Sequence, residues 1–199
     1  MFDKDDFFHK ATLLICSSFQ IERALYRIYT YLRHHMPAEQ MHLGVLEPSA
    51  ARIRVIASAD GTGGLLCNYS VPLSAASCAQ ALGEPPRDWE RLITPAEYGP
   101  IAQDWIRFHG QPPTAYLSML LSMEDGGYGF LSVGTGPSST FQPQHRERLA
   151  LLRKPFEIAL ANALKHEGAY DPHMIPDSTD RIGGPVLNAV AEEKIMGAN

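Results

Sequence analysis

The chain has 199 residues, of which 45% are apolar and 20% charged, and its formal net charge is −5. This composition is typical of a globular chain with one sizeable core, and its acidic balance disfavours direct contact with nucleic acid. Three cysteines without a CxxC pair indicate a reducing compartment rather than a disulfide framework. The acidic first residues and the lack of a long apolar run favour a cytoplasmic protein without membrane contact.

Two helices are predicted at the start of the chain. In residues 3–18 four apolar residues recur at helical spacing, namely Phe7, Ala11, Leu14 and Ile15. Ser17 and Gln20 have the spacing of a capping box, so we expect a second helix over 19–36. Pro37 should end it, because the residue before a proline avoids helical geometry. The apolar stripe of this second helix is Ile21, Leu25, Ile28, Leu32 and Met36.

Two antiparallel hairpins are predicted further along the chain. Residues 41–47 and 52–59 alternate between apolar and polar side chains and are joined by the turn sequence PSAA. Residues 114–124 and 128–136 are apolar, have strand length and are separated by an Asp-Gly pair, which is typical of a tight hairpin turn.

The middle of the chain has weaker patterns. A loop is expected over 60–64, a strand in LLCNYSV (65–71) and a short helix over 74–83. Prolines and glycines then interrupt the chain every few residues, and only IAQDWIRFHG (101–110) indicates a helix there.

A long amphipathic helix is predicted near the end, with Gln142 as N-cap, Pro143 in the first turn and Gly168 after the last turn. Pro155 stands in its middle, where it should remove one backbone hydrogen bond and crowd the carbonyl of Leu151, at a cost of about 3 kcal/mol. Burial of the apolar stripe against a sheet should offset that cost, at about 1.5–3 kcal/mol per large side chain. The stripe is Leu149, Leu152, Phe156, Ala159, Leu160 and Ala163.

The order of these elements predicts the α+β class. The early helix and the late helix should lie together on one side of an antiparallel sheet, because both carry an apolar stripe that needs a large partner surface. The other side of the sheet would then be covered by the irregular middle.

Two segments, 7–48 and 128–166, resemble a GAF domain, most closely the N-terminal sensor domain of sigma-54-dependent (AAA+) transcriptional activators. LLRKPFEIALANAL (151–164), including its proline, is the most specific part; residues 60–112 match only in placement. The resemblance implies a GAF-like (PAS-like) central antiparallel sheet of about six strands. The N- and C-terminal helices would pack on one face, and a small-molecule pocket would lie on the other.

The resemblance also implies a domain organisation. Residues 1–168 would be the GAF sensor domain, and 169–199 a linker leading to the start of an AAA+ ATPase, whose first residues EEKIMGAN (192–199) resemble. The chain itself has no GxxxxGK[ST] phosphate-binding loop. The expected partners are a small-molecule effector, the AAA+ domain of the same full-length chain and a second copy bound through the terminal helices. The sequence identifies no cofactor.

Strand alternation places one set of side chains on the face away from the helices. Small hydroxyl groups among apolar residues suit a ligand pocket, although solvent-facing serines explain the same pattern. Asp104 and His109 in the middle could also touch a ligand. The candidates for the pocket, including two cysteines that could instead be small buried hydrophobes, are His42, Gly44, Leu46, Cys67, Cys78, Trp105, Ser118, Leu120, Ser122 and Ser132.

These patterns favour a regulatory, non-enzymatic sensor domain that binds a small ligand and controls an attached ATPase. Three alternatives remain open from the sequence. The first is a redox enzyme of the GAF type, related to methionine sulfoxide reductases, that uses Cys67 or Cys78. The second is a metal or haem sensor that uses His42, His109 and a cysteine. The third is a dimerisation platform without a ligand.

Overall fold

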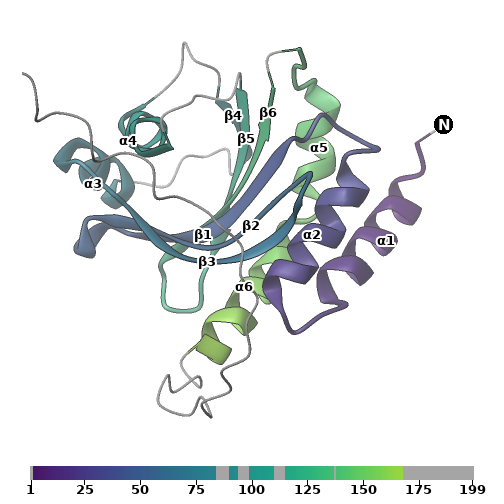
Figure 1. The fold of residues 1–199 in the computed structure, drawn as a ribbon, viewed down its shortest axis with the longest axis horizontal. Helices are drawn as coiled ribbons and strands as arrows, with labels where there is room; N and C mark the ends of the chain where they lie inside the picture. The colour runs from purple at the N-terminus through teal and green to yellow at the C-terminus, as the bar shows by residue number, and fades with distance from the viewer. Residues whose placement is uncertain (1, 84–89, 94–98, 110–114, 137, 168–199) are drawn as a thin grey trace, which may run out of the picture. The chain divides into compact units, whose positions relative to one another are not determined.

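The computed structural model describes residues 2–83, 90–93, 99–109, 115–136 and 138–167 (Figure 1). The helices are α1 (Lys4–Cys16), α2 (Ile21–Leu32), the 3-10 helix η1 (Pro48–Ala50), α3 (Ala75–Leu82), α4 (Pro100–His109), α5 (Pro143–Ala150) and α6 (Arg153–Glu167). The strands are β1 (Gln40–Glu47), β2 (Arg52–Asp60), β3 (Gly63–Pro72), β4 (Glu90–Ile93), β5 (Ala115–Ser122) and β6 (Tyr128–Thr135).

The six strands form one antiparallel sheet in the order β3-β2-β1-β6-β5-β4. Both predicted hairpins are confirmed, and Gly126 adopts a φ of 81° in the β5–β6 turn, as its Asp-Gly sequence favours. The expected loop over 60–64 is wrong in extent, because β2 continues through Asp60 and β3 begins at Gly63 after a tight turn. Strand β4 was not expected; it pairs with β5 at the edge of the sheet.

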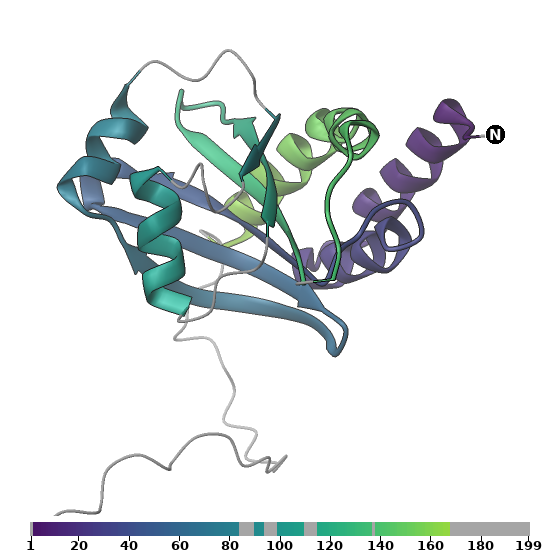
Figure 2. The same ribbon diagram turned by 90° about the horizontal axis from the view of Figure 1, so that it is seen from above.

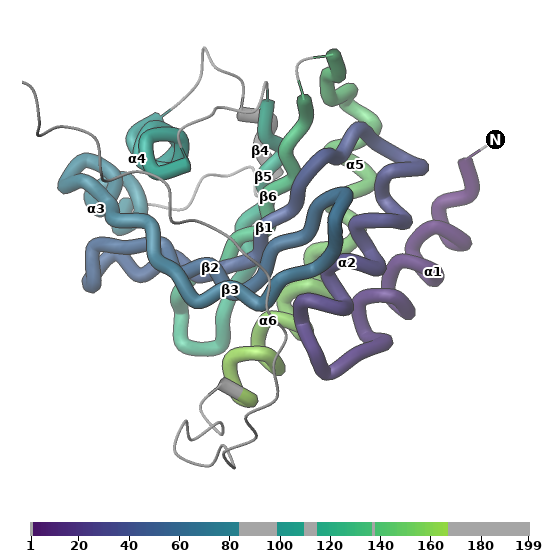
Figure 3. Tube along the Cα trace, in the orientation of Figure 1, coloured from purple at the N-terminus to yellow at the C-terminus, as the bar shows by residue number. Residues whose placement is uncertain are grey.

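The helices divide between the two faces of the sheet (Figure 2). Helices α2, α5 and α6 contact the strands on one face, and α1 packs against α2 and α6. Helices α3 and α4 lie side by side on the other face, where α4 contacts β3 (Figures 1 and 3). The α+β class and the placement of the terminal helices on one face are therefore confirmed.

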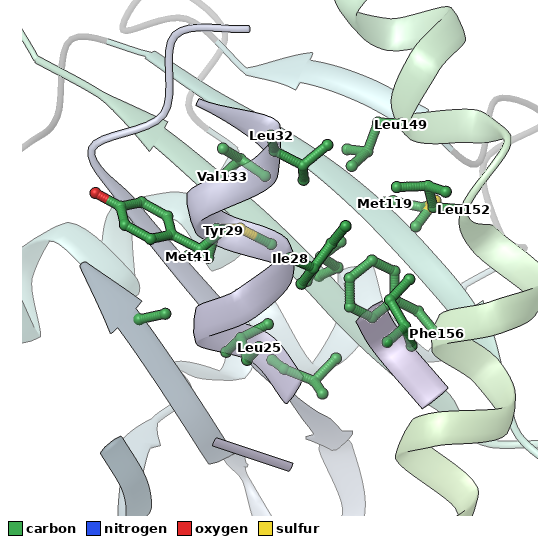
Figure 4. Close-up of a cluster of buried hydrophobic side chains, with 14 of the residues drawn as sticks. Leu25, Ile28, Tyr29, Leu32, Met41, Met119, Val133, Leu149, Leu152 and Phe156 are labelled. Carbon is green, nitrogen blue, oxygen red and sulfur yellow. The ribbon is translucent and has the colours of Figure 1, made fainter. Parts of the chain in front are cut away.

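The main core fills the space between the sheet and the terminal helices. Helix α2 contributes its predicted stripe, and β1 alternates so that Met41, Leu43 and Val45 are buried on this side. Figure 4 shows Ile28 of α2, Phe156 of α6 and Met119 of β5 meeting in this core. The apolar side chains that recur along the helix and along the strand thus pack against each other, as the sequence predicted.

Two details of the first helices differ from the prediction. Ser17 does not cap α2; its hydroxyl donates to the carbonyl of Leu14 and so ends α1. Gln20 is the N-cap of α2 and makes no side-chain capping bond. The second helix also ends before Pro37, because α2 stops at Leu32 and the chain continues in turns.

Pro155 does not interrupt a helix. The expected long helix is two helices, and α6 begins at Arg153, so Pro155 is its third residue. The first N–H groups of a helix have no acceptor within it, so a proline at this position removes no helical hydrogen bond. The next residue, Phe156, already donates its N–H to the carbonyl of Leu152 at 3.1 Å. The predicted cost of about 3 kcal/mol therefore does not arise. Gln142 as N-cap is confirmed, and its N–H donates to Nδ1 of His145 at 3.0 Å.

We expect Pro155→Ala to lower the free energy of unfolding by no more than about 1 kcal/mol, because only the rigidity of proline in the unfolded chain is lost. Asn162→Pro, at an exposed position inside α6, should lower it by about 3 kcal/mol. Urea unfolding of both variants measures the difference. Equal losses would show that Pro155 lies inside a continuous helix.

Gly168 and the expected linker and AAA+ start, 169–199, lie outside the described residues. Among the helices that the structure describes, none has the length and apolarity needed to cross a membrane.

Candidate functional site

Helices α3 and α4, here called the roof, lie on the face of the sheet opposite the terminal helices, where α4 contacts β3 and α3 contacts η1 (Figure 2). Between the roof and the sheet lies a second, smaller cluster of buried side chains. It consists of Ile53, Val55, Cys67, Val71, Leu73, Trp105, Tyr116 and Phe130.

Asp104 of α4 holds the roof together. It is 5% exposed and accepts hydrogen bonds from the backbone N–H of Ser74 at 2.7 Å and from the hydroxyl of Ser77 at 2.5 Å. Arg107 donates to its other oxygen at 3.0 Å. Burial alone would raise the pKa of Asp104, but the hydrogen bonds from Ser77 and Ser74 and the charge of Arg107 lower it overall. Asp104 is therefore an ionised anchor between α3 and α4.

A row of four polar side chains crosses the sheet beneath the roof. The strand register pairs His42 of β1 with Ser58 of β2 on one side and with Ser132 of β6 on the other, and pairs Ser132 with Ser118 of β5. The hydroxyls of Ser118 and Ser132 lie 3.0 Å apart and share a hydrogen bond. At the other end the thiol of Cys67 lies 3.3 Å from the hydroxyl of Ser58. We call Ser58, His42, Ser132 and Ser118 the polar row.

His42 occupies the centre of this row and is only 9% exposed. Among the described residues, its Nδ1 has no hydrogen-bond partner. The ring centroid of Trp105 lies 5.0 Å from that of His42, and that of His109 lies 5.8 Å away. Burial, and then the neighbouring His109, lower the pKa of His42 to about 4, so its imidazole is neutral at pH 7.

Aromatic rings surround His42 on the roof side. Nε1 of Trp105 donates to the hydroxyl of Tyr116 at 2.9 Å, which fixes the indole over the sheet. The rings of Trp105 and His109 have centroids 4.4 Å apart, and Tyr69 lies 5.9 Å from His109. Burial, and then Cys67, raise the pKa of Tyr69 to about 12, so the phenol stays protonated.

Comparison with known proteins identifies this architecture. No family model matches the sequence, and no curated protein matches it. Solved structures do match. The GAF domain of an Acinetobacter phosphoenolpyruvate-protein phosphotransferase is 14% identical, with a TM-score of 0.58, over 84% of this chain and 99% of that one. The phycocyanobilin-bound GAF domain of a cyanobacterial phytochrome is 12% identical, with a TM-score of 0.56, over 83% and 98%. The fold is that of a GAF domain.

The GAF fold also occurs in an enzyme that matches this chain. The free methionine-R-sulfoxide reductase of Neisseria meningitidis, solved in complex with its substrate, is 11% identical, with a TM-score of 0.52. The match covers 82% of this chain and 91% of that one. At such identities the comparisons show the fold alone.

The GAF fold brings most of the predicted pocket residues together. His42, Ser118, Ser132, Cys67 and Trp105 meet between the roof and the sheet. Partly buried side chains that pack against the second cluster include Leu46, Cys78 and Leu120.

Two predicted pocket residues have other surroundings. A Cβ on Gly44 would lie 2.4 Å from the carbonyl oxygen of Arg54 and 2.7 Å from the ring of Phe130, so Gly44 makes room for Phe130. Ser122 is exposed at the end of β5, and its N–H donates to Glu157 of α6, so the structure does not bring it to the polar row.

Sequence reasoning missed several residues of this site, notably Ser58, Tyr69, Tyr116 and Phe130. Ser58 could have been found, because it is polar at an alternating position between Ala57 and Ala59. The other three are aromatic residues whose neighbours come from distant segments, and only the register places them.

A groove of about 360 Å³ lies elsewhere, between the β5–β6 hairpin and α6. Four of its charged side chains pair with one another, Lys154 with Glu157 at 3.1 Å and Lys165 with Glu124 at 3.5 Å. The roof site has the stronger chemical signal for a ligand, because Nδ1 of the buried His42 has no hydrogen-bond partner in the part of the chain that the structure describes.

The described residues contain no group of three or more His, Cys, Asp or Glu side chains that could hold a metal ion. Cys67 is buried, and burial raises the pKa of its thiol despite the hydrogen bonds to Ser58. A raised thiol pKa lowers the thiolate fraction and therefore the nucleophilicity of Cys67 at neutral pH.

We expect the protein to lose stability as the pH falls from 7 to 5, partly because of His42. The unfolded chain binds a proton at His42 near pH 6.5 and the folded chain only near pH 4, so acid favours unfolding. The contribution of His42 to this loss should be about 2 kcal/mol. Urea unfolding at both pH values, in wild type and His42→Asn, isolates it by difference. An equal pH dependence in both proteins would show that His42 is protonated, or accessible to water, in the fold.

Proposed function

We propose that this chain is the sensor domain of a transcriptional regulator, which binds a small molecule between the roof and the sheet. The observation that carries the proposal is the buried, neutral imidazole of His42, whose Nδ1 lacks a partner among the described residues. A polar group buried without a hydrogen bond costs about 1–3 kcal/mol, which a bound ligand with a matching group would recover. A phytochrome GAF domain of the same fold binds phycocyanobilin, which supports a small-molecule site here.

The proposal does not include catalysis. Cys67 is the better buried of the two cysteines beside the site, and its raised pKa makes it a poor nucleophile. The redox alternative therefore depends on Cys78, which is partly buried on α3. Wild type should reduce free methionine sulfoxide no faster than a sample without protein, and replacement of both Cys67 and Cys78 by serine should not change that rate. Activity in wild type that the double variant lacks would establish the enzyme instead.

Ligand sensing is tested by a thermal-shift screen with a library of neutral, anionic and cationic metabolites. Because a ligand specific to the folded state raises the apparent stability by mass action, at least one compound should raise Tm in a saturable way. The His42→Asn variant should lose the effect, and the exposed control His34→Asn should keep it. A library without any stabiliser would favour the dimerisation platform, in which the terminal helices bind a second copy.

The finer proposal is that the ligand controls an AAA+ ATPase of a sigma-54-dependent activator. It is supported by the resemblance of residues 151–164 and 192–199 to such proteins. The coding sequence downstream of Asn199 should then encode a GxxxxGK[ST] loop. In the full-length protein, the compound found in the screen should change the rate of ATP hydrolysis. A downstream sequence without that loop would contradict this part of the proposal and leave ligand sensing intact.

A further inference from the structure

Within the described residues, the polar row consists of two hydrogen-bonded pairs and, between them, one group that lacks a partner. Ser118 and Ser132 bond to each other at 3.0 Å, and Ser58 bonds to Cys67. His42 lies between these pairs and is only 9% exposed, and its Nδ1 has no hydrogen-bond partner among the described residues. A ligand atom would therefore gain the most hydrogen-bond energy at the centre of the row, beside His42.

The hydrogen-bonding capacity of the row has a definite character. A neutral imidazole carries one donor and one acceptor nitrogen. When two hydroxyls share one hydrogen bond, the accepting hydroxyl still has its own hydrogen to donate, and lone pairs remain on both. Ser118, Ser132 and His42 thus present both donors and acceptors, and a complementary ligand edge carries both as well.

The groups that face His42 are uncharged at neutral pH. From α4, His109 faces it, and burial lowers the pKa of His109. Burial raises the pKa of Cys67 and of Tyr69, both on β3. Asp60 of β2 is the one carboxylate that acts on the titration of His42 among the described residues.

The other charges near the roof are already paired. Asp104 binds Ser74, Ser77 and Arg107. Asp60 lies at the exposed end of β2 and is held by the N–H and hydroxyl of Thr62. A charged ligand buried at His42 would therefore have no counter-ion inside the roof site among the described side chains, which is strongly unfavourable.

The surroundings of the row are flat and aromatic. Trp105 lies 5.0 Å from His42 and 5.9 Å from Phe130, and Tyr69 stacks on Phe108 at 5.7 Å with the two rings 9° from parallel. Aromatic rings of this kind contact other flat rings favourably, face to edge or offset face to face.

We propose that the roof site binds an uncharged, planar aromatic or heteroaromatic molecule, whose edge carries both a donor and an acceptor, as a carboxamide or lactam does. The amide-like edge pairs with Nδ1 of His42 and the hydroxyls of Ser118 and Ser132, and the ring lies against Trp105. This inference rests on the proposed function and specifies the ligand class of the same site.

Four small probes test the ligand class at pH 7. Benzamide is planar, neutral and has the amide edge; benzoate replaces that edge by an anion; benzylamine is a cation; cyclohexanecarboxamide keeps the amide without the flat ring. Binding is followed by the imidazole nitrogen signals of His42 and the indole N–H signal of Trp105 in NMR spectra. Benzamide should shift both signals in a saturable way and bind about tenfold tighter than each of the other three, which corresponds to about 1.4 kcal/mol.

The variants separate the hydrogen bond from the ring contact. His42→Phe keeps a flat buried ring but removes Nδ1, and it should weaken benzamide binding about tenfold. His42→Leu provides a second replacement without hydrogen-bonding groups in case the phenylalanine disturbs the fold, and it should weaken benzamide binding at least as much. The exposed control His34→Phe should bind benzamide as wild type does.

The outcomes distinguish this inference from the proposed function. If benzoate or benzylamine shifts the His42 signals at lower concentration than benzamide, the site is a ligand site but the ligand class is wrong. Equal binding of cyclohexanecarboxamide would overturn the requirement for a planar ring. If no probe shifts His42 while the metabolite library contains a stabiliser, the inference fails alone; if the library also contains none, both fail.

Discussion

Phe156→Ala should lower the free energy of unfolding by about 3–5 kcal/mol. Phe156 is 1% exposed and lies in the main core, where α6 meets α2 and the sheet (Figure 4). Its truncation removes a large apolar surface and leaves a cavity, because the helices and strands around it cannot close the space fully. Urea unfolding monitored by circular dichroism measures the loss.

Ile158 provides the matched control for this prediction. It lies on the same helix two residues further on and is 49% exposed, so Ile158→Ala should lower the free energy of unfolding by less than about 1 kcal/mol. Similar losses in the two variants would mean that α6 does not present Phe156 to the sheet. The placement of the terminal helices on one face would then be wrong.

Asp104→Ala should lower the free energy of unfolding by about 3 kcal/mol and loosen the roof. The substitution leaves the N–H of Ser74 and the hydroxyl of Ser77 without their acceptor in a buried position, and hydrogen bonds to a charged group contribute about 1.5–3 kcal/mol each. Both lost bonds join α3 to α4. Amide hydrogen exchange should therefore accelerate more in α3 and α4 than in α2, because the roof gains local openings in addition to the easier global unfolding.

Glu147, an exposed carboxylate on α5, provides the control. Glu147→Ala should change the free energy of unfolding by no more than about 0.5 kcal/mol. If Asp104→Ala leaves the exchange of α4 as slow as in wild type, Asp104 does not anchor the roof.

Local patterns were enough to predict much of the fold. The 3.6-residue period of α2 and the alternation in β1 each identified the buried side, because every second or third side chain must meet the same surface. The division of β1 into Met41, Leu43 and Val45 on one face and His42 on the other is confirmed. Asp-Gly between two apolar segments identified the β5–β6 hairpin for a similarly local reason.

Other features depend on contacts between distant segments. Strand β4 has four residues and no turn signal of its own; it exists as a strand because β5 pairs with it. The helix is interrupted between Ala150 and Arg153, so Pro155 lies in the first turn of α6. The apolar spacing continues across 149–163 without a break and therefore gave no sign of this interruption. The polar row needs the register of four strands, which no spacing in the sequence provides.

We expect the small molecule to bind between the roof and the sheet and not in the groove beside α6. The most direct measurement is an NMR titration of the protein with the strongest stabiliser from the metabolite screen. We expect saturable shifts of the His42 imidazole and Trp105 indole signals, with the methyl signals of Met123, Ile158 and Leu164 unchanged. Shifts of those three methyl signals, with His42 and Trp105 unchanged, would place the ligand in the groove and show that the roof site is not the binding site.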